Sequence, residues 1–277
     1  MQALLIPPDK PTRLEFVRDY PDPHAAADEV LIRVHLAGVC ATDLELVRGY
    51  MSFAGVPHHE FVGTVDAGPR NLIGSGAGRS RSRLVRRVVA EINCVCGQCA
   101  LCRRGLSNHC PQRTVLGIAG RDGAFAEYLN VPARNCHVVP DSLSDRQAVF
   151  AEPLAAAVHH TSPKRKRGAL IGSGAGRSRS RLVRLALQLC RPCGTIVRQS
   201  TYAEPAGLDL APLVVNEIHL VGNRCGPLAE ALRLLADRRI EVDELVSAEY
   251  PLADGVAALA AAERPENVKI LLRPGPP

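Results

Sequence analysis

Residues 94–110 read CVCGQCALCRRGLSNHC and contain half of the chain's cysteines. Four of these follow the spacing C-x2-C-x2-C-x7-C, and Gly97 and Gly105 allow the chain to turn between them. Four thiolates close a tetrahedron around Zn²⁺ and leave no open position, as in structural zinc sites. Four unrelated buried cysteines are the alternative, and Cys94 is either a bystander or an alternative ligand. The spacing predicts a structural zinc site formed by Cys96, Cys99, Cys102 and Cys110.

Three short motifs outside this stretch carry further residue types that bind metals. Residues 38–43 read GVCATD after an alternating, strand-like run at 30–37, residues 57–63 read PHHEFVG, and residues 151–155 read AEPLA. A thiolate, an imidazole and a carboxylate from separate loops can hold zinc and leave one position open, as a catalytic zinc needs. Each motif alone is weak, because a lone histidine beside proline is usually a turn residue and a lone glutamate is usually solvated.

Taken in order, the motifs G-x-C-x-T-D, H-E-x-x-G, the four-cysteine loop and E-P-L-A resemble the landmarks of the zinc-containing medium-chain alcohol dehydrogenases. The resemblance covers residues 1–160 and resumes from about 185 to 273. It implies a mixed α/β protein, with a GroES-like β-barrel catalytic domain and a reduced Rossmann-like α/β domain. The implied activity is the reversible oxidation of an alcohol or polyol with NAD or NADP.

The resemblance also assigns residues to a catalytic zinc site. It implies that Glu60 is an acidic neighbour able to exchange onto the metal, that Thr42 relays the substrate proton, and that Asp43 supports the ligands. One position departs from the family, because His58 stands where glycine usually precedes the His-Glu pair. His58 would either strain the loop or offer a competing imidazole. The implied ligands of the catalytic zinc are Cys40, His59 and Glu152.

The implied domain boundaries are 1–155 for the catalytic domain, 156–245 for the nucleotide domain and 246–277 for a return to the catalytic domain. Basic inserts are expected at 70–86 and 162–184, because both contain the identical sequence LIGSGAGRSRSRLVR. An offset of 98 residues with perfect identity is not structural periodicity. Nucleic-acid binding is the alternative, but neither segment has interleaved aromatic residues, which favours two solvated inserts.

The nucleotide domain lacks its expected first half. Residues 172–177 read GSGAGR and resemble G-x-G-x-x-G, but the third glycine comes one position early, and no acidic residue follows until Glu204. Without a glycine turn the pyrophosphate has no anchor, so we expect impaired hydride transfer. A catalytically inactive zinc-binding remnant, with a binding or structural role, is the alternative. The resemblance places four residues near the nicotinamide: Ser200, Thr201, Asn223 and Arg224.

Several secondary-structure elements are expected from the sequence pattern. Strands are predicted at 61–66, 87–93, 195–197, 217–222 and 268–272, and helices at 182–189, 226–238 and 251–262. No stretch approaches the roughly 20 apolar residues of a membrane span. With no export signal at the N-terminus, we expect a cytoplasmic protein. The expected partners are a small-molecule alcohol and, as in relatives that pair through the nucleotide domain, a second copy of the chain.

Overall fold

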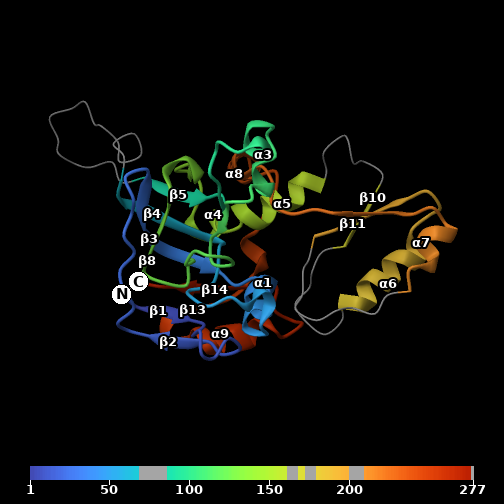
Figure 1. Cartoon of the computed structure of the whole chain (residues 1–277). Helices are drawn as coiled ribbons and strands as arrows, with labels where there is room; N and C mark the ends of the chain where they lie inside the picture. The colour runs from blue at the N-terminus through green and yellow to red at the C-terminus, as the bar shows by residue number, and fades with distance from the viewer. Residues whose placement is uncertain (69–85, 161–167, 172–178, 200–208, 276–277) are drawn as a thin grey trace.

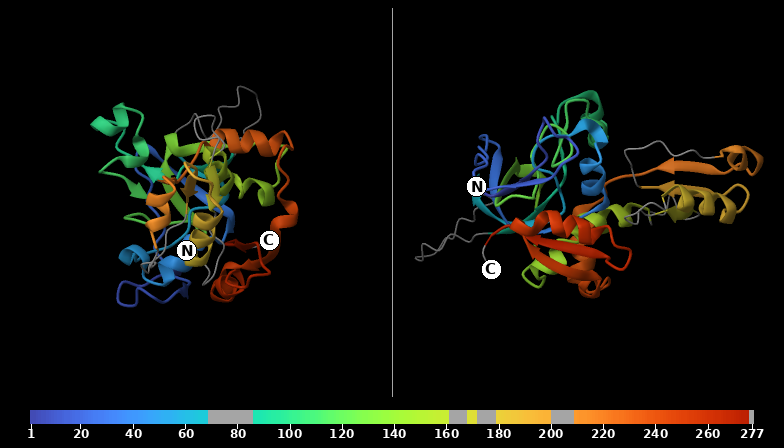
Figure 2. Two further views of the ribbon diagram at one scale, coloured as in Figure 1. Left: turned by 90° about the vertical axis from the view of Figure 1, so that its right-hand side faces the viewer. Right: turned by 90° about the horizontal axis from the view of Figure 1, so that it is seen from below.

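The computed structural model describes residues 1–68, 86–160, 168–171, 179–199 and 209–275 (Figure 1). These residues form a larger body built around a β-sheet and a smaller α/β lobe that extends from one side of it. The right-hand view of Figure 2 shows the lobe projecting away from the body, while both chain ends lie on the body.

Seven strands form the main sheet, in the order β13-β14-β3-β4-β5-β9. Strand β8 pairs with the first half of β3, on the same edge that β14 joins at the end of β3. The C-terminal strand β14 pairs antiparallel with β3, so the end of the chain completes the sheet begun near its start. The strands are β3 (Glu29–Gly38), β4 (Phe61–Ala67), β5 (Arg87–Ala90), β8 (Tyr128–Pro132), β9 (Cys136–Val138), β13 (Val246–Pro251) and β14 (Lys269–Arg273).

Alternation of side chains explains strand β3 and confirms the strand predicted at 30–37. Val30, Ile32 and Val34 face one apolar cluster and are at most 2% exposed, whereas Arg33 between them is exposed. Leu36 joins a second cluster on the opposite side, because the pairing with β4 shifts register between Val34 and Leu36. The sheet therefore has an apolar core on each face.

The second apolar cluster joins the sheet to helices α5 (Ala151–His160) and α8 (Leu228–Ala236). The buried residues of α8 recur at helical spacing, and burial of each leucine side chain contributes about 2 kcal/mol. The helix predicted at 226–238 is thus confirmed, two residues shorter at each end. The buried residues of α8 are Leu228, Ala231, Leu232 and Leu235.

The other described elements of the body are short. The predicted strand at 87–93 is divided between β5 and β6, and the predicted helix at 251–262 begins as a 3₁₀ turn. The helices are α1 (Ala41–Val47), α3 (Ala100–Arg103), α4 (Asp145–Ala148) and α9 (Gly255–Ala262), and the strands are β1 (Ala3–Leu5), β2 (Glu15–Val17), β6 (Asn93–Cys94) and β7 (Thr114–Val115). The 3₁₀ turns are η1 (Tyr50–Ser52), η2 (Ser107–His109), η3 (Ala133–Asn135), η5 (Asp243–Leu245) and η6 (Leu252–Asp254).

The smaller lobe is a three-stranded parallel sheet in the order β10-β11-β12. Its own core consists of Val183, Leu187, Ile196 and Ile218. Parallel strands with helices between them are the βα units of nucleotide-binding folds. The elements are β10 (Gly168–Ile171), α6 (Arg179–Leu189), β11 (Thr195–Arg198), α7 (Ala211–Val215) and β12 (His219–Gly222).

The second basic segment differs from the expected solvated insert. Residues 168–171 form an edge strand, and residues 179–184 form the first half of α6, where Val183 is 3% exposed. Val183 and Leu187 are four residues apart on one helix face, so this face packs on the lobe's sheet. The first basic segment at 70–85 and the glycine run at 172–177 lie outside the described residues. Among the described helices, none is long and apolar enough to cross a membrane.

Candidate metal centres

The four predicted cysteine ligands converge in the loop between β6 and β7. Their Sγ atoms all lie within 4.8 Å of one another. Cys110 Sγ is 3.6 Å from Cys96 Sγ and 3.9 Å from Cys99 Sγ. Four sulfurs at about 2.3 Å from one zinc ion are about 3.8 Å apart in a tetrahedron, so the spacing fits zinc. The fourth sulfur is that of Cys102.

Backbone groups of the cysteine loop favour thiolates. Main-chain hydrogen bonds from Gln98 and Cys99 lower the pKa of Cys96 to about 6. A main-chain hydrogen bond from Cys102 likewise lowers the pKa of Cys99. Burial and the neighbouring thiols raise the pKa of Cys102 to about 11, and a zinc ion would displace that proton. The loop is therefore poised to bind a cation that takes all four sulfurs as thiolates.

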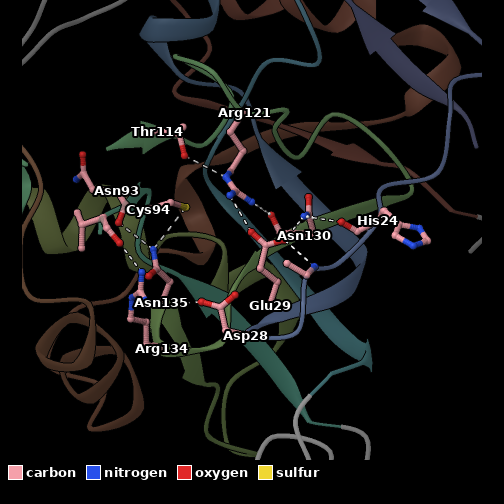
Figure 3. Close-up of polar contacts among 12 residues, drawn as sticks. His24, Asp28, Glu29, Asn93, Cys94, Thr114, Arg121, Asn130, Arg134 and Asn135 are labelled. Carbon is pink, nitrogen blue, oxygen red and sulfur yellow. Dashed lines mark hydrogen bonds and ion pairs between the residues drawn. The ribbon is translucent and has the colours of Figure 1, made fainter. Parts of the chain in front are cut away.

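The base of the loop is anchored by polar contacts (Figure 3). Asn135 Nδ2 donates to the carbonyl oxygens of Glu91 and Asn93 at 2.8 and 3.0 Å, and contacts Cys94 Sγ at 3.7 Å. Cys94 is buried in β6, where burial raises the pKa of its thiol, and it is not part of the compact ligand groups found among the described residues. Cys94 therefore lies outside the ligand group and contacts Asn135 at the base of the loop.

Arg121 ties the far end of this loop to the sheet. Its Nε donates to Thr114 Oγ1 at 3.2 Å, and its Nη2 forms an ion pair with Glu29 at 2.8 Å (Figure 3). Glu29 begins β3, so the cysteine loop and the central strand are held in a fixed relation.

A second ligand group lies where helix α1 and strand β4 begin. Cys40 immediately precedes α1, and His59 and Glu60 immediately precede β4. Ligand atoms of Cys40, His59 and Glu60 lie within 4.8 Å of one another, and Cys40 Sγ is 3.8 Å from His59 Nε2. Sulfur and nitrogen ligands of one tetrahedral zinc are about 3.6 Å apart, so this pair also fits the metal.

These ligands line a cavity of about 580 Å³. The proposed proton relay Thr42 lines it too, as does Glu152, the expected third ligand, from the first turn of α5. Glu152 is not part of the compact group, and the carboxylate that joins Cys40 and His59 there is Glu60. Of the residues expected near the nicotinamide, Arg224 lines the cavity, whereas Ser200 and Thr201 lie outside the described residues.

Sequence reasoning missed a buried ion pair at this centre. Lys269 Nζ, from strand β14, lies 2.6 Å from Glu60 Oε2 and 3.3 Å from the carbonyl oxygen of Val39. Burial, the largest single cause, lowers the pKa of Lys269, but Glu60, Cys40 and Asp43 together outweigh it and raise that pKa above its ordinary value. The two residues are 209 positions apart, so no spacing in the sequence indicated the contact.

A second missed contact joins His58 to Asp43. His58 Nδ1 lies 2.9 Å from Asp43 Oδ2, and both side chains are fully buried. Burial, the largest single cause, raises the pKa of Asp43, but His58, His59 and the main-chain N–H of Cys40 together outweigh it and lower the pKa of the carboxyl. In the described part of the chain, neither Asp43 Oδ1 nor His59 Nδ1 has a hydrogen-bond partner.

Burial also acts on Cys40 and Glu152, which both line the cavity. It raises the pKa of Cys40 well above its ordinary value, with Asp43 and Glu60 adding to the effect. It raises the pKa of Glu152 from 4.5 to about 8, with the Glu60 carboxylate as the next cause. A divalent cation bound here would reverse both effects, because it stabilises the anionic forms.

Glu152→Gln is expected to change how the stability of the metal-free protein depends on pH. Because the folded-state pKa of Glu152 is raised to about 8, wild-type stability falls as pH rises from about 4.5 to 8. Glutamine mimics the neutral acid, so the variant should match wild type at pH 5 and exceed it at pH 8. Urea unfolding of chelator-treated protein measures this. Equal stability of the two proteins at pH 8 would contradict the assignment.

Comparison with known proteins agrees with this fold. Residues 26–141 match the family of alcohol dehydrogenase GroES-like domains. The chain is 38% identical over 165 residues to the starvation-sensing protein RspB of Escherichia coli K12, a match that covers 58% of this chain and 45% of that protein. It is 35% identical over 157 residues to an L-threonine 3-dehydrogenase of Chelativorans, covering 54% and 43% of the two chains. The chain is thus similar to alcohol dehydrogenases within the GroES-like domain at residues 26–141.

Solved structures share the fold along the whole chain. The short chain alcohol dehydrogenase rspB of Escherichia coli CFT073, complexed with NADH, superposes with a TM-score of 0.78 at 23% identity and 99% coverage of both chains. Galactitol-1-phosphate dehydrogenase of Escherichia coli gives a TM-score of 0.77 at 18% identity, with 99% and 100% coverage. By contrast, the sequence matches cover about half the length of the curated relatives.

Proposed function

We propose that this chain is a zinc-dependent oxidoreductase that transfers a hydride between an alcohol or polyol and NAD or NADP. The observation that carries the proposal is the ligand group Cys40, His59 and Glu60 at the wall of a 580 Å³ cavity that Thr42 and Arg224 also line. A three-residue group leaves one coordination position for a substrate oxygen. The four-cysteine group has no such position and supports a structural role for the other zinc.

Four residues of this chain would act on the substrate or on the metal ligands: Thr42, Glu60, Glu152 and Lys269. Zinc would supply Lewis acidity that lowers the pKa of the alcohol, and NAD(P) would accept the hydride. Thr42 would accept the hydroxyl proton at its Oγ1 and pass it outward. Lys269 would hold Glu60 by its 2.6 Å ion pair, and Glu152 would move toward the ligand group once a cation favours its carboxylate.

The proposed substrate class is an alcohol with a second polar group near the reacting hydroxyl. Tyr50 and Arg113 line the cavity beside Thr42, so the wall offers hydrogen-bond donors besides the metal ligands. Two of the similar proteins are named for L-threonine and galactitol 1-phosphate, which share this feature. Both lines of support are compatible with a polyol or a hydroxy acid.

A second candidate is a zinc-stabilised binding protein without turnover. Its support is the size of the described lobe, which has three parallel strands where a full dinucleotide domain has two mononucleotide-binding halves. The two candidate functions differ in one observable result. An oxidoreductase reduces NAD or NADP when an alcohol is added, and a binding protein does not.

Thr42→Val tests the proposed relay against this alternative. Zinc-loaded wild type should reduce NAD or NADP in the presence of polyols or hydroxy acids, followed by absorbance of the reduced nicotinamide. The valine variant should lose roughly 10²–10⁴-fold in turnover, because general acid–base catalysis is removed. Thr42→Ser keeps the hydroxyl and is expected to retain activity. No cofactor reduction by wild type across the panel would favour the binding protein, and a fully active T42V would exclude Thr42 as the relay.

A further inference from the structure

His58 occupies a backbone position that favours glycine. Its φ is +91°, in the left-handed region that L side chains rarely adopt. Gly117 and Gly123 press against its main chain, and a Cβ on either would lie within 2.2 Å of the His58 carbonyl oxygen. The turn is therefore fixed by its surroundings, and the side chain of His58 must offset the strain through its own contacts.

Those contacts form a bridge within the metal centre. His58 Nδ1 lies 2.9 Å from Asp43 Oδ2, and the same oxygen accepts a hydrogen bond from the main-chain N–H of Cys40 at 2.8 Å. On the other side, His58 Nε2 lies 2.6 Å from the carbonyl oxygen of Glu60 and 3.1 Å from its main-chain nitrogen. The ring stacks on Phe125, with centroids 4.2 Å apart and an angle of 4°.

We propose that His58 is a positioning residue of the second metal centre, linking the main chain of Cys40, through Asp43, to the main chain of Glu60. This inference rests on the proposed function, because it assumes that Cys40, His59 and Glu60 bind a metal ion. It concerns how these ligands are held in place and not the rate of the reaction. A ligand histidine usually donates its second ring N–H to a carboxylate. Here Asp43 is engaged by His58, and His59 Nδ1 has no acceptor among the described residues. Support therefore reaches the ligand group through His58.

Two other roles for His58 make different predictions. If the ring only fills space against Phe125, phenylalanine at position 58 would preserve the site. If His58 is itself a ligand, with Cys40 and Asp43 as the compact group they also form, no amide side chain would restore binding. Asparagine distinguishes the cases, because its amide nitrogen takes the place of Nδ1 and can donate to Asp43. Asparagine also tolerates a positive φ better than most residues.

The experiment is titration of the metal-free protein with Co²⁺ and Zn²⁺ against a competing chelator, with the cobalt absorption bands as a second readout. Wild type should bind two ions. His58→Phe should weaken binding at the second site by about 10–100-fold and shift its cobalt bands, as loss of an outer-shell partner does. H58N restores the contact with Asp43 but not the one with Glu60, so it should recover part of that affinity. The four-cysteine site, unchanged in every variant, reports that each protein is folded.

The proposal is overturned if H58F binds the second ion as tightly as wild type, if H58N is no better than H58F, or if wild type binds a single ion. Should H58F not fold, Asp43→Asn weakens the same link from its other end and should cause the same loss of affinity. Absence of alcohol oxidation in a wild type that shows the expected metal affinities would refute the proposed function while leaving the role of His58 intact.

Discussion

Cys110→Ser is expected to release one of two zinc ions and to lower the free energy of unfolding by about 4 kcal/mol. Cys110 Sγ is buried and lies within 3.9 Å of two other thiols, so its loss opens the tetrahedron. The loop it closes contains only the four-residue helix α3 and a 3₁₀ turn. Such a segment has little apolar burial of its own, so the proposed zinc ion would provide most of its stability.

Zinc content by mass spectrometry and urea unfolding at pH 7 measure the two effects. Cys193→Ser is the matched control, because Cys193 is exposed on the smaller lobe, away from both ligand groups. A Cys110→Ser protein that keeps two zinc ions and the wild-type unfolding midpoint would exclude the structural site.

His59→Ala is expected to release the other zinc ion and to lower turnover by roughly 10³-fold or more, since a catalytic metal contributes several kcal/mol to the transition state. The imidazole Nε2 is one of three close ligand atoms, and burial lowers the pKa of His59, which keeps the ring neutral and able to bind a cation. Stability should change less than in Cys110→Ser, because the surrounding core of β3 and β4 remains.

His219→Ala provides the control for this second substitution, because His219 is exposed on β12. Zinc stoichiometry and turnover should both match wild type in that variant. If His59→Ala lost its zinc and still turned over at the wild-type rate, the metal would have no part in the reaction.

The sequence indicated which candidate ligands come together where these residues are close in the chain or lie at the ends of strands and helices. The convergence of the four cysteines could be predicted, because the first and last of them are only 14 positions apart. Cys40 and His59 were predictable from motifs flanking a strand whose alternation is clear. Glu152 was harder, because its distance from them depends on how α5 packs against α8.

Contacts across the fold could not be predicted from the sequence. The pairing of Glu60 with Lys269 requires β14 to join the sheet beside β3, and the pairing of His58 with Asp43 requires an unfavourable backbone angle. The second basic segment was expected to stay in solvent because of its charge. Its helical face of Val183 and Leu187 instead packs against the lobe's sheet, since apolar periodicity decides burial even in a basic helix.

Calorimetry of NAD(H) and NADP(H) binding to the zinc-loaded chain tests most directly whether the chain has the cofactor site that the proposed oxidoreductase requires. The cavity that holds the ligand group is also lined by Gln199 and Arg224, which end or follow the strands of the smaller lobe. The proposed oxidoreductase predicts binding of one of the two cofactors, at a single site. A folded chain that retains both zinc ions and binds neither cofactor would contradict the proposed oxidoreductase and leave the zinc-stabilised binding protein as its function.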